Sequence, residues 1–282
     1  MKSPRIAFFG TPSLCIPILD ALKDNGYIPS VIITNPDRPV GRKALLTPPP
    51  TKLWAEDHGI VCHQPERLDS DFALWYRDQD IDIALVVAYG KIIPEHIIDM
   101  PRHGTLNIHY SLLPRWRGAS PVEAALIAGD THTGVCIQKM VYELDAGDIL
   151  AEKRIPIDPH EVAPQLLDRL NTLGASMLIE LLPLYIDGKI TPTPQDKDAI
   201  TMCTKIKKSD GEVSLTDMTP QELWNRYRAY YGWPGIFFFD TDGKRIKITS
   251  AHMNNDQFII DKVIPEGKKE MDFDGWNTRR RQ

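Results

Sequence analysis

A short run of alternating polarity at residues 105–109 (TLNIH) holds the residues whose types and spacing best suit catalysis. Side chains two positions apart on a strand share a face, so Asn107 and His109 are predicted to point the same way. A carboxamide beside an imidazole supplies two hydrogen-bond donors, which can stabilise a developing oxyanion. Asp145 follows in the turn-forming stretch 144–148, which is expected to fold back over the strand and orient the imidazole. By residue type alone, a strand asparagine and histidine are more often structural than catalytic.

The elements that must position these residues begin with a strand, a helix and a second strand, expected over residues 5–9, 13–24 and 28–34. This β-α-β order predicts an α/β fold with a Rossmann-like, mostly parallel sheet flanked by helices. The first turn lacks a Gly-x-Gly-x-x-Gly pattern, so the sequence gives no support for a dinucleotide site. The apolar run 81–88 predicts a central strand that delivers Tyr89 and Gly90 to the carboxyl edge of the sheet, where open α/β sheets place their ligands.

The C-terminal part of the chain differs in pattern from the rest. After a long amphipathic helix at 161–186, the Thr-Pro-Thr-Pro segment at 191–194 predicts a linker. A helix at 219–228 is followed by β-like runs with Asp-Gly and Asn-Asn turns, which predict a small C-terminal β-barrel of the OB-like type. We therefore expect three parts, namely a catalytic domain at 1–188, a linker at 189–203 and a C-terminal domain at 204–282.

Composition places the chain among ordinary globular proteins, with 282 residues of which 42% are hydrophobic and 25% charged, and a formal net charge of −5. No apolar run reaches the ~18–20 residues that a membrane helix needs, and the sequence enters a strand without room for a signal peptide. The four cysteines form no Cys-x-x-Cys pair, which favours reduced thiols in a cytoplasmic protein. His58, Cys62 and His63 cluster without a fourth ligand, so no metal site is predicted.

A longer motif surrounds the candidate catalytic residues. The string NIHYSLLP at 107–114, followed by RG at 117–118 and LDAGD at 144–148, resembles the signature of the folate-dependent formyltransferases. That family uses an Asn, His and Asp trio to move a formyl group from 10-formyltetrahydrofolate to an amine. The match of all elements in order and spacing is far more specific than a lone three-residue motif, and the resemblance extends over nearly the whole chain.

The resemblance implies a role for each member of the motif. Asn107 and protonated His109 would stabilise the tetrahedral oxyanion, while Asp145 would keep His109 charged and help to remove the amine proton. Tyr110 stands where relatives often have a smaller residue, and we expect it to narrow the folate pocket slightly. The residues that the resemblance assigns to folate binding are Tyr89, Gly90, Ile92, Ser111, Leu112, Leu113, Pro114 and Asp148.

A long irregular loop is expected at residues 35–50, because prolines and a glycine there disfavour regular structure. Its bases Arg38, Arg42 and Lys43 suit a solvated surface. In their Pro-Asp-Arg-Pro-x-Gly-Arg setting they also resemble the insertion loop with which the methionyl-tRNA formyltransferase branch of the family contacts the tRNA acceptor end. The resemblance thus implies tRNA contacts by these three residues.

The C-terminal part also resembles that branch, at Trp233-Pro234-Gly235 and at 267–271. Between about residues 251 and 257 the chain is a strand or two shorter than is usual in the branch, so we expect a shortened tRNA-binding domain. The residues before Trp233 are also Tyr-Tyr-Gly, where the branch usually has Asn-Pro. Both departures weaken the inference of an RNA acceptor and leave the predicted chemistry unchanged.

The resemblance implies a monomeric enzyme of translation initiation that transfers formyl from 10-formyltetrahydrofolate to the free amino group of methionyl initiator tRNA, with no metal. Two alternatives stay open. A formyltransferase acting on an amino sugar nucleotide would share the trio and the donor but would not need Arg38 and Arg42. A non-catalytic RNA-binding protein of the same fold would not bind 10-formyltetrahydrofolate.

Overall fold

The computed structural model describes residues 3–41 and 43–278, so Arg42 lies outside the described residues. These residues form two compact units. The first comprises residues up to 117 together with 134–154 and 168–201, and the second comprises 118–133, 155–167 and 202 onward. In the described part of the chain, no helix combines the length and the apolar character that crossing a bilayer requires.

A seven-stranded sheet lies at the centre of the first unit, in the order β10-β9-β7-β6-β1-β2-β5. Strand β1 pairs in parallel with β2 and β6, β2 with β5, and β6 with β7, whereas β7 and β9 pair antiparallel. The mostly parallel sheet that the β-α-β order predicts is therefore confirmed. Its strands are β1 (Ile6–Gly10), β2 (Val31–Ile33), β5 (Val61–His63), β6 (Ile83–Val87), β7 (Thr105–His109), β9 (His132–Lys139) and β10 (Ile149–Pro156).

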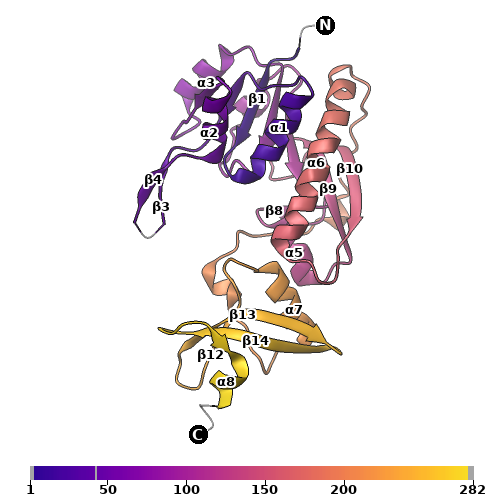
Figure 1. Cartoon of the computed structure of the whole chain (residues 1–282). Coiled ribbons are helices and arrows are strands. Elements are labelled where there is room, and N and C mark those ends of the chain that lie inside the picture. The colour runs from indigo at the N-terminus through magenta and orange to yellow at the C-terminus, as the bar shows by residue number, and fades with distance from the viewer. Residues whose placement is uncertain (1–2, 42, 279–282) are drawn as a thin grey trace. The chain divides into compact units, whose positions relative to one another are not determined.

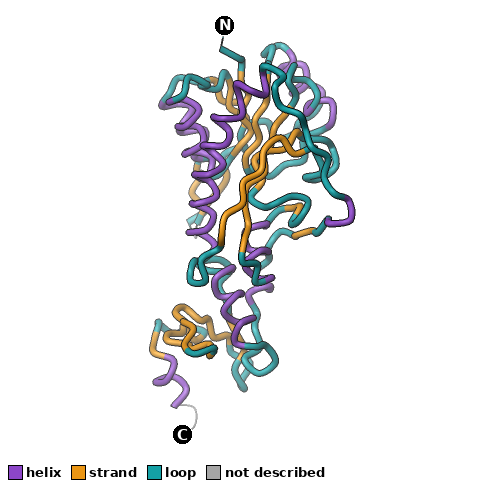
Figure 2. Tube along the Cα trace, turned by 90° about the vertical axis from the view of Figure 1, so that its right-hand side faces the viewer, coloured by secondary structure: helices purple, strands orange, loops and turns teal. Residues whose placement is uncertain are grey.

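Helices flank this sheet, and the strands run between them in Figures 1 and 2. Asp69 caps α3 by accepting a hydrogen bond from the Phe72 amide, as an N-cap aspartate is expected to do. Helix α6 contacts the sheet at Gly174, where an added methyl group would lie 3.0 Å from Ile108 of β7. The helices are α1 (Ile16–Asp24), α2 (Pro50–Asp57), α3 (Ser70–Arg77), α4 (Glu95–Ile98) and α6 (Ala163–Ile186).

Residues 35–50 differ from the expected irregular loop. Strands β3 (Arg38–Val40) and β4 (Leu45–Thr47) pair antiparallel and make a hairpin that projects from the sheet (Figure 1). The prediction was wrong because a two-stranded ribbon has only edge strands, and an edge strand tolerates a proline such as Pro39. The hairpin turns through Gly41, whose φ is +72°.

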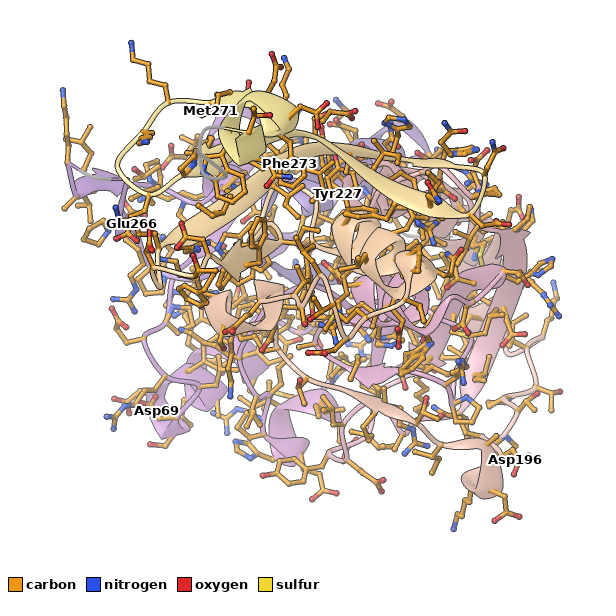
Figure 3. The ribbon with its side chains drawn as sticks, turned by 90° about the horizontal axis from the view of Figure 1, so that it is seen from below. Asp69, Asp196, Tyr227, Glu266, Met271 and Phe273 are labelled. Atoms are coloured by element: carbon orange, nitrogen blue, oxygen red, sulfur yellow. The ribbon has the colours of Figure 1, made fainter. Side chains whose placement is uncertain are left out.

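The second unit contains two packed helices and an antiparallel sheet. Helix α5 (Pro121–Ala128) packs against α7 (Pro220–Ala229), and α7 begins with a reciprocal capping box between Thr219 and Glu222. The sheet order is β12-β13-β14-β15, which confirms an antiparallel C-terminal β region. Figure 3 labels Tyr227 on α7 and Met271 and Phe273 where β15 meets α8. The elements that follow α7 are β12 (Phe237–Phe239), β13 (Arg245–Asn254), β14 (Gln257–Pro265), β15 (Met271–Asp272) and α8 (Phe273–Thr278).

The stretch near 251–257, expected to be short, is a regular part of this sheet. Strand β13 continues to Asn254 and returns as β14 from Gln257. The two turn residues, Asn255 and Asp256, both have positive φ, as a two-residue hairpin turn requires. The two strands are therefore joined here by a tight hairpin turn.

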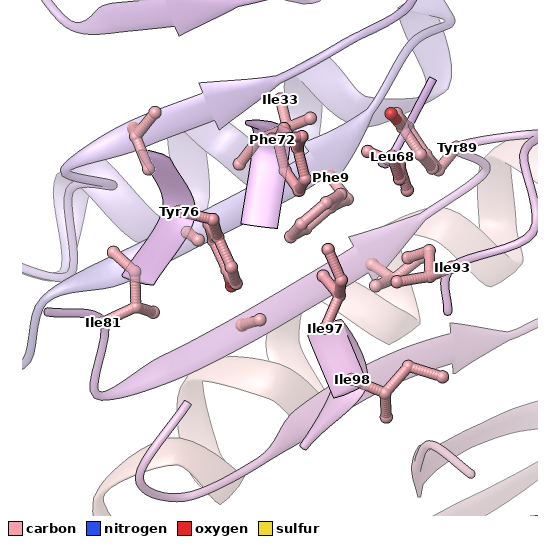
Figure 4. Packing of buried hydrophobic residues seen from close by; sticks show 14 residues of the cluster. Phe9, Ile33, Leu68, Phe72, Tyr76, Ile81, Tyr89, Ile93, Ile97 and Ile98 are labelled. Atoms are coloured by element: carbon pink, nitrogen blue, oxygen red, sulfur yellow. The ribbon is translucent and has the colours of Figure 1, made fainter. Parts of the chain in front are cut away.

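An apolar cluster of the first unit lies on the sheet face covered by α3 and α4. Phe9 of β1 makes edge-to-face contacts with Tyr76 of α3 at 5.6 Å and with Tyr89 at 5.3 Å between ring centroids. Figure 4 shows these rings together with Phe72 and Ile97. Tyr89, which follows β6, is thus anchored in the core by its side chain, and only its backbone is available at the sheet edge.

Candidate active site

Asn107, His109 and Asp145 meet at the carboxyl end of β7. The Asn107 amide Nδ2 lies 3.5 Å from Asp145 Oδ1, and His109 Nδ1 lies 3.7 Å from the same oxygen. The His109 side chain is 6% exposed and that of Asp145 is 12% exposed, so little water screens the pair. The structure therefore brings the three predicted residues together, with the carboxylate between the two donors.

His109 also has a partner on its other ring nitrogen. Its Nε2 lies 2.9 Å from the Trp116 carbonyl, which can only accept, so Nε2 carries a hydrogen and donates it. When Nδ1 also carries a hydrogen, both contacts are favourable. In the neutral ring with hydrogen on Nε2, the Nδ1 lone pair would face the Asp145 carboxylate. The His109 ring is thus held between the Asp145 carboxylate and the Trp116 carbonyl.

Gln138 joins the trio, although the sequence analysis did not single it out. It pairs directly across the sheet from Asn107, so both side chains are on the same face. Its amide Nε2 donates to Asp145 Oδ1 at 3.1 Å, and its Oε1 accepts the Gly147 amide at 3.1 Å. One buried side chain thus fixes both the Asp145 carboxylate and the backbone two residues later.

The loop that carries Asp145 has a backbone shape that few residues adopt. Asp145 has a φ of +50°, in the left-handed region that costs most non-glycine residues energy. A methyl group on Gly147 would lie 1.7 Å from the Lys139 carbonyl oxygen, so only glycine fits there. The LDAGD string therefore encodes a specific turn as well as a carboxylate.

A buried arginine and a second glutamine lie behind this loop. Gln195 Nε2 donates to the carbonyls of Asp145 at 2.8 Å and of Gly147 at 2.7 Å. Its Oε1 accepts from Arg117 Nε and Nη2 at 3.0 and 2.9 Å. Arg117 Nη1 lies 3.2 Å from Glu143, which balances the charge of this 4% exposed residue. Sequence reasoning missed Gln195 because it is distant in the chain from the motif.

Cys136 is a chemically reactive side chain on β9, where it pairs across the sheet from His109 of β7. Burial raises the pKa of its thiol, so the thiolate that a nucleophilic cysteine needs is disfavoured. Its sulfur accepts the Leu113 amide at 3.3 Å. Cys136 therefore supports the 111–114 segment and is a poor candidate for covalent chemistry.

All the predicted folate-binding residues except Asp148 lie in two segments at one edge of the sheet. Tyr89 and Gly90 follow β6, and the 111–114 segment follows β7, which pairs with β6 in parallel. The backbone carbonyl of Tyr89 accepts from Asn35 Nδ2 at 2.9 Å, and Asn35 was not predicted. Parallel neighbours end at the same edge, so both segments are near the trio.

Within these segments the side chains differ in accessibility. Ser111 is fully buried and donates to the Arg115 carbonyl at 2.6 Å, so its hydroxyl is already used. Leu113 is buried and Leu112 is half-buried, whereas Pro114 follows Leu113 through a cis peptide bond. Ile92 is 80% exposed and offers an apolar surface. Asp148 is exposed, and its backbone carbonyl accepts the Lys139 amide at 2.9 Å.

Tyr110 points away from this site. Its hydroxyl donates to Asn171 Oδ1 of α6 at 2.7 Å, and the Asn171 amide in turn donates to the Leu14 carbonyl at 2.9 Å. Because side chains alternate along an extended segment, Tyr110 lies on the opposite face from His109. The expectation that it narrows the folate pocket was therefore wrong.

The predicted tRNA-binding bases are separate from the trio. Arg38 is on β3, where its Nη2 forms a 2.7 Å ion pair with Glu66 Oε2. Lys43 is exposed at the hairpin turn, and Arg42 lies outside the described residues. Three apolar side chains of the hairpin are strongly exposed, with Val40 57%, Leu45 64% and Leu46 69% accessible.

Comparison with known proteins agrees with this geometry. Family models described as "Formyl transferase" and "Formyl transferase, C-terminal domain" match residues 4–182 and 205–260. The chain is 46% identical over 231 residues to the methionyl-tRNA formyltransferase of Halorhodospira halophila, covering 82% of this chain and 74% of that protein. It is 35% identical over 291 residues to that of Macrococcus caseolyticus, covering 95% and 93%.

Solved structures share the fold. A methionyl-tRNA formyltransferase from Clostridium thermocellum superimposes with a TM-score of 0.63 at 16% identity, covering 93% of this chain and 98% of that one. A sugar N-formyltransferase from a Shewanella species gives 0.69 at 15% identity, covering 89% and 99%. At identities this low, the similarity shows only that the fold is shared. Because the first family model covers more than half of the sequence, this chain belongs to the formyl transferase family.

Proposed function

We propose that this protein transfers the formyl group of 10-formyltetrahydrofolate to the free amino group of methionyl initiator tRNA. The observation that carries the proposal is the meeting of Asn107 and His109 on the Asp145 carboxylate, beside the edge where β6 and β7 end. Relatives that match most of the chain at 35–46% identity are methionyl-tRNA formyltransferases, which supports this acceptor over an amino sugar nucleotide.

The folate supplies an activated formyl group, whose carbonyl oxygen becomes an oxyanion when the amine attacks. Asn107 Nδ2 donates to that oxygen, and preorganised donors of this kind are typically worth about 2.7–4 kcal/mol each. His109 donates its Nε2 hydrogen to the oxyanion, which requires it to share or release the contact with Trp116. The amine nitrogen gains a bond to the formyl carbon as the bond from that carbon to the folate nitrogen breaks.

Asp145 has two tasks in this scheme. Its carboxylate stabilises the imidazolium of His109, and it receives the proton that the attacking amine loses and passes it to the departing folate nitrogen. Gln138 already occupies part of the Asp145 hydrogen-bonding capacity and keeps the carboxylate in place for both tasks.

Folate binding is assigned to the two segments at the carboxyl ends of β6 and β7. Backbone groups of residues 89–90 and 111–114 would hold the pterin, and the exposed Ile92 and half-buried Leu112 would contact its apolar surface. This fits a ligand site with a few polar groups on an otherwise apolar wall. The proposed parts of the chain are a catalytic domain at 1–188, a linker at 189–203 and a tRNA-binding domain at 204–282.

The hairpin is assigned to the acceptor. Arg38 and Lys43 are exposed bases beside exposed Leu45 and Leu46, a combination suited to phosphate contacts and to packing against unstacked bases. Arg42 belongs to the same proposal by its sequence position.

The test is direct transfer. The purified protein is mixed with 10-formyltetrahydrofolate and initiator tRNA charged with methionine, and formyl-methionine released from the tRNA is quantified at low and moderate salt. We expect rapid transfer that weakens with salt, because phosphate contacts release counterions. Parallel reactions with amino sugar nucleotides should yield nothing. Transfer to an amino sugar nucleotide but not to tRNA would show that the proposed acceptor is wrong. Failure to bind 10-formyltetrahydrofolate would reject the proposed enzymatic function.

A further inference from the structure

Two non-glycine residues that contact the His109 ring have left-handed backbone conformations. Asp145, beside Nδ1, has a φ of +50°, and Trp116, whose carbonyl accepts from Nε2, has a φ of +61°. Such conformations persist only where surrounding structure holds them, and they concentrate at functional sites. What holds these two residues therefore determines the position and the hydrogen bonds of His109.

Both residues are held by one short segment, 193–201, which the sequence identifies only as a linker. Gln195 donates to the carbonyls of Asp145 and Gly147 and so fixes the left-handed turn from its backbone side. Thr201 Oγ1 accepts the Trp116 amide at 2.9 Å, and the Thr201 carbonyl accepts the Arg117 amide at 2.9 Å. Each side of the imidazole is thus supported by a different residue of the same segment.

Further contacts fix the segment itself. Thr193 makes a two-way backbone bridge with Ile149 of β10, with N···O distances of 2.8 and 2.9 Å. Asp196, labelled in Figure 3, accepts the Asp198 amide and begins a short 3-10 helix, Lys197–Ala199. Arg117 is bonded to Gln195 and, through its amide, to Thr201, so it ties the two supports together.

We propose that the segment 193–201 is a positioning element for formyl transfer, in which Gln195 sets the Asp145 turn and Thr201 sets the Trp116 carbonyl. Neither residue touches the reacting atoms. Both act through His109, because the Trp116 carbonyl competes with the oxyanion for the Nε2 hydrogen and Asp145 contacts Nδ1 on the other side of the ring. This inference rests on the proposed function and assigns it a support outside the sequence motif.

Gln195→Glu is the sharpest variant, because it keeps the shape of the side chain and the oxygen that accepts from Arg117. It replaces the amide that donates to two carbonyls with an oxygen that repels them. We expect kcat to fall by up to about 100-fold, the loss that a displacement of about 1 Å at a reacting centre can cause, while the KM for tRNA stays within twofold. Gln79→Glu is the matched control, since Gln79 also donates to a backbone carbonyl, that of Trp75, at 3.1 Å in the same unit.

Thr201 allows a rescue experiment. Thr201→Val removes the hydroxyl that accepts the Trp116 amide and keeps the branched shape, whereas Thr201→Ser keeps the hydroxyl. We expect Thr201→Val to lower kcat and Thr201→Ser to restore it to within about twofold of wild type. A loss of packing alone would rank the two in the opposite order, because valine fills the space better than serine.

A second readout separates this inference from the proposed function. The ring nitrogens of His109 are followed by nitrogen NMR across a pH titration without any substrate, with His109→Asn to assign the signal. In Gln195→Glu we expect the His109 titration curve to shift relative to wild type, and in Gln79→Glu it should not. An inactive wild-type protein would reject the proposed function but leave this test intact. An unchanged titration together with unchanged kcat in Gln195→Glu would overturn the inference.

Discussion

The neighbourhood of Asp145 and the β3–β4 hairpin are opposites, although the resemblance to formyltransferases assigns function to both. At Asp145, side chains are buried and joined by hydrogen bonds, with His109 5% and Gln138 1% exposed. On the hairpin, Leu45 and Leu46 are 64% and 69% exposed, and Arg38 has a surface ion pair to Glu66. The geometry around Asp145 is fixed by contacts within the protein, whereas the side chains of the hairpin are exposed to solvent.

The difference reflects what each region must do. Polar groups buried beside one another have to be satisfied together, so the arrangement around Asp145 is set before any substrate arrives. Catalysis benefits from such preorganisation, because donors that are already aimed need no rearrangement in the transition state. Under the proposed function, the exposed side chains of the hairpin instead gain their partners on binding. We therefore expect site variants to change kcat and hairpin variants to change the KM for the acceptor.

The largest effect is expected from Asn107→Ala. It removes an oxyanion donor at the centre of the site, and loss of one such donor typically lowers kcat by about 10²–10³-fold. The fold should survive, because Asn107 is only half-buried and Gln138 still holds Asp145. Steady-state kinetics with charged initiator tRNA, together with thermal unfolding, measure both quantities. Activity within twofold of wild type would remove Asn107 from the mechanism.

Much of this site was predictable from the sequence, and the reasons are local. The alternation in residues 105–109 places Asn107 and His109 on one face, and in the structure both side chains approach Asp145 Oδ1. The LDAGD string at 144–148 predicted a turn. The positive φ of Asp145 and the lack of space for a side chain at Gly147 explain why the turn requires these residue types. The β-α-β pattern likewise predicted the parallel sheet that carries β7.

The parts that could not be predicted depend on long-range register. Gln138 reaches Asp145 because β9 pairs with β7 so that residue 138 faces residue 107, and nothing in either strand alone fixes that pairing. The one available signal was a glutamine directly after the apolar run 135–137 of that strand. Gln195 is 50 residues from Asp145, and a linker composition gave no reason to expect a contact with the Asp145 loop. Tyr110 was misjudged because its partner, Asn171, is on a helix far along the chain.

Gln138→Leu tests how far the support of the Asp145 loop by Gln138 matters for catalysis, while Asn107, His109 and Asp145 all stay in place. The variant loses the donor to Asp145 and leaves the buried Gly147 amide without its acceptor, which costs about 1–3 kcal/mol of stability. Misplacement of Asp145 should lower kcat by about 10- to 100-fold, with the KM for tRNA little changed. Urea unfolding and initial rates measure the two effects, and Gln79→Leu provides the control for removing a half-buried amide. A variant that lost only stability would show that Gln138 packs the loop without tuning its carboxylate.

The smallest effect is expected on the hairpin, where Arg38 permits a paired experiment. Arg38→Ala removes a base whose ion pair is exposed on both sides, so stability should change by no more than about 0–1 kcal/mol. If Arg38 contacts a phosphate, Arg38→Ala raises the KM for tRNA, and the slope of log KM against the logarithm of salt concentration falls by about one.

Glu66→Ala leaves Arg38 in place and removes the carboxylate that competes with a phosphate for the Arg38 guanidinium. That variant should lower the KM for tRNA, and kcat should stay unchanged in both. Opposite shifts in KM from the two halves of one ion pair would identify Arg38 as an acceptor contact, because loss of the pair itself would shift both variants in the same direction.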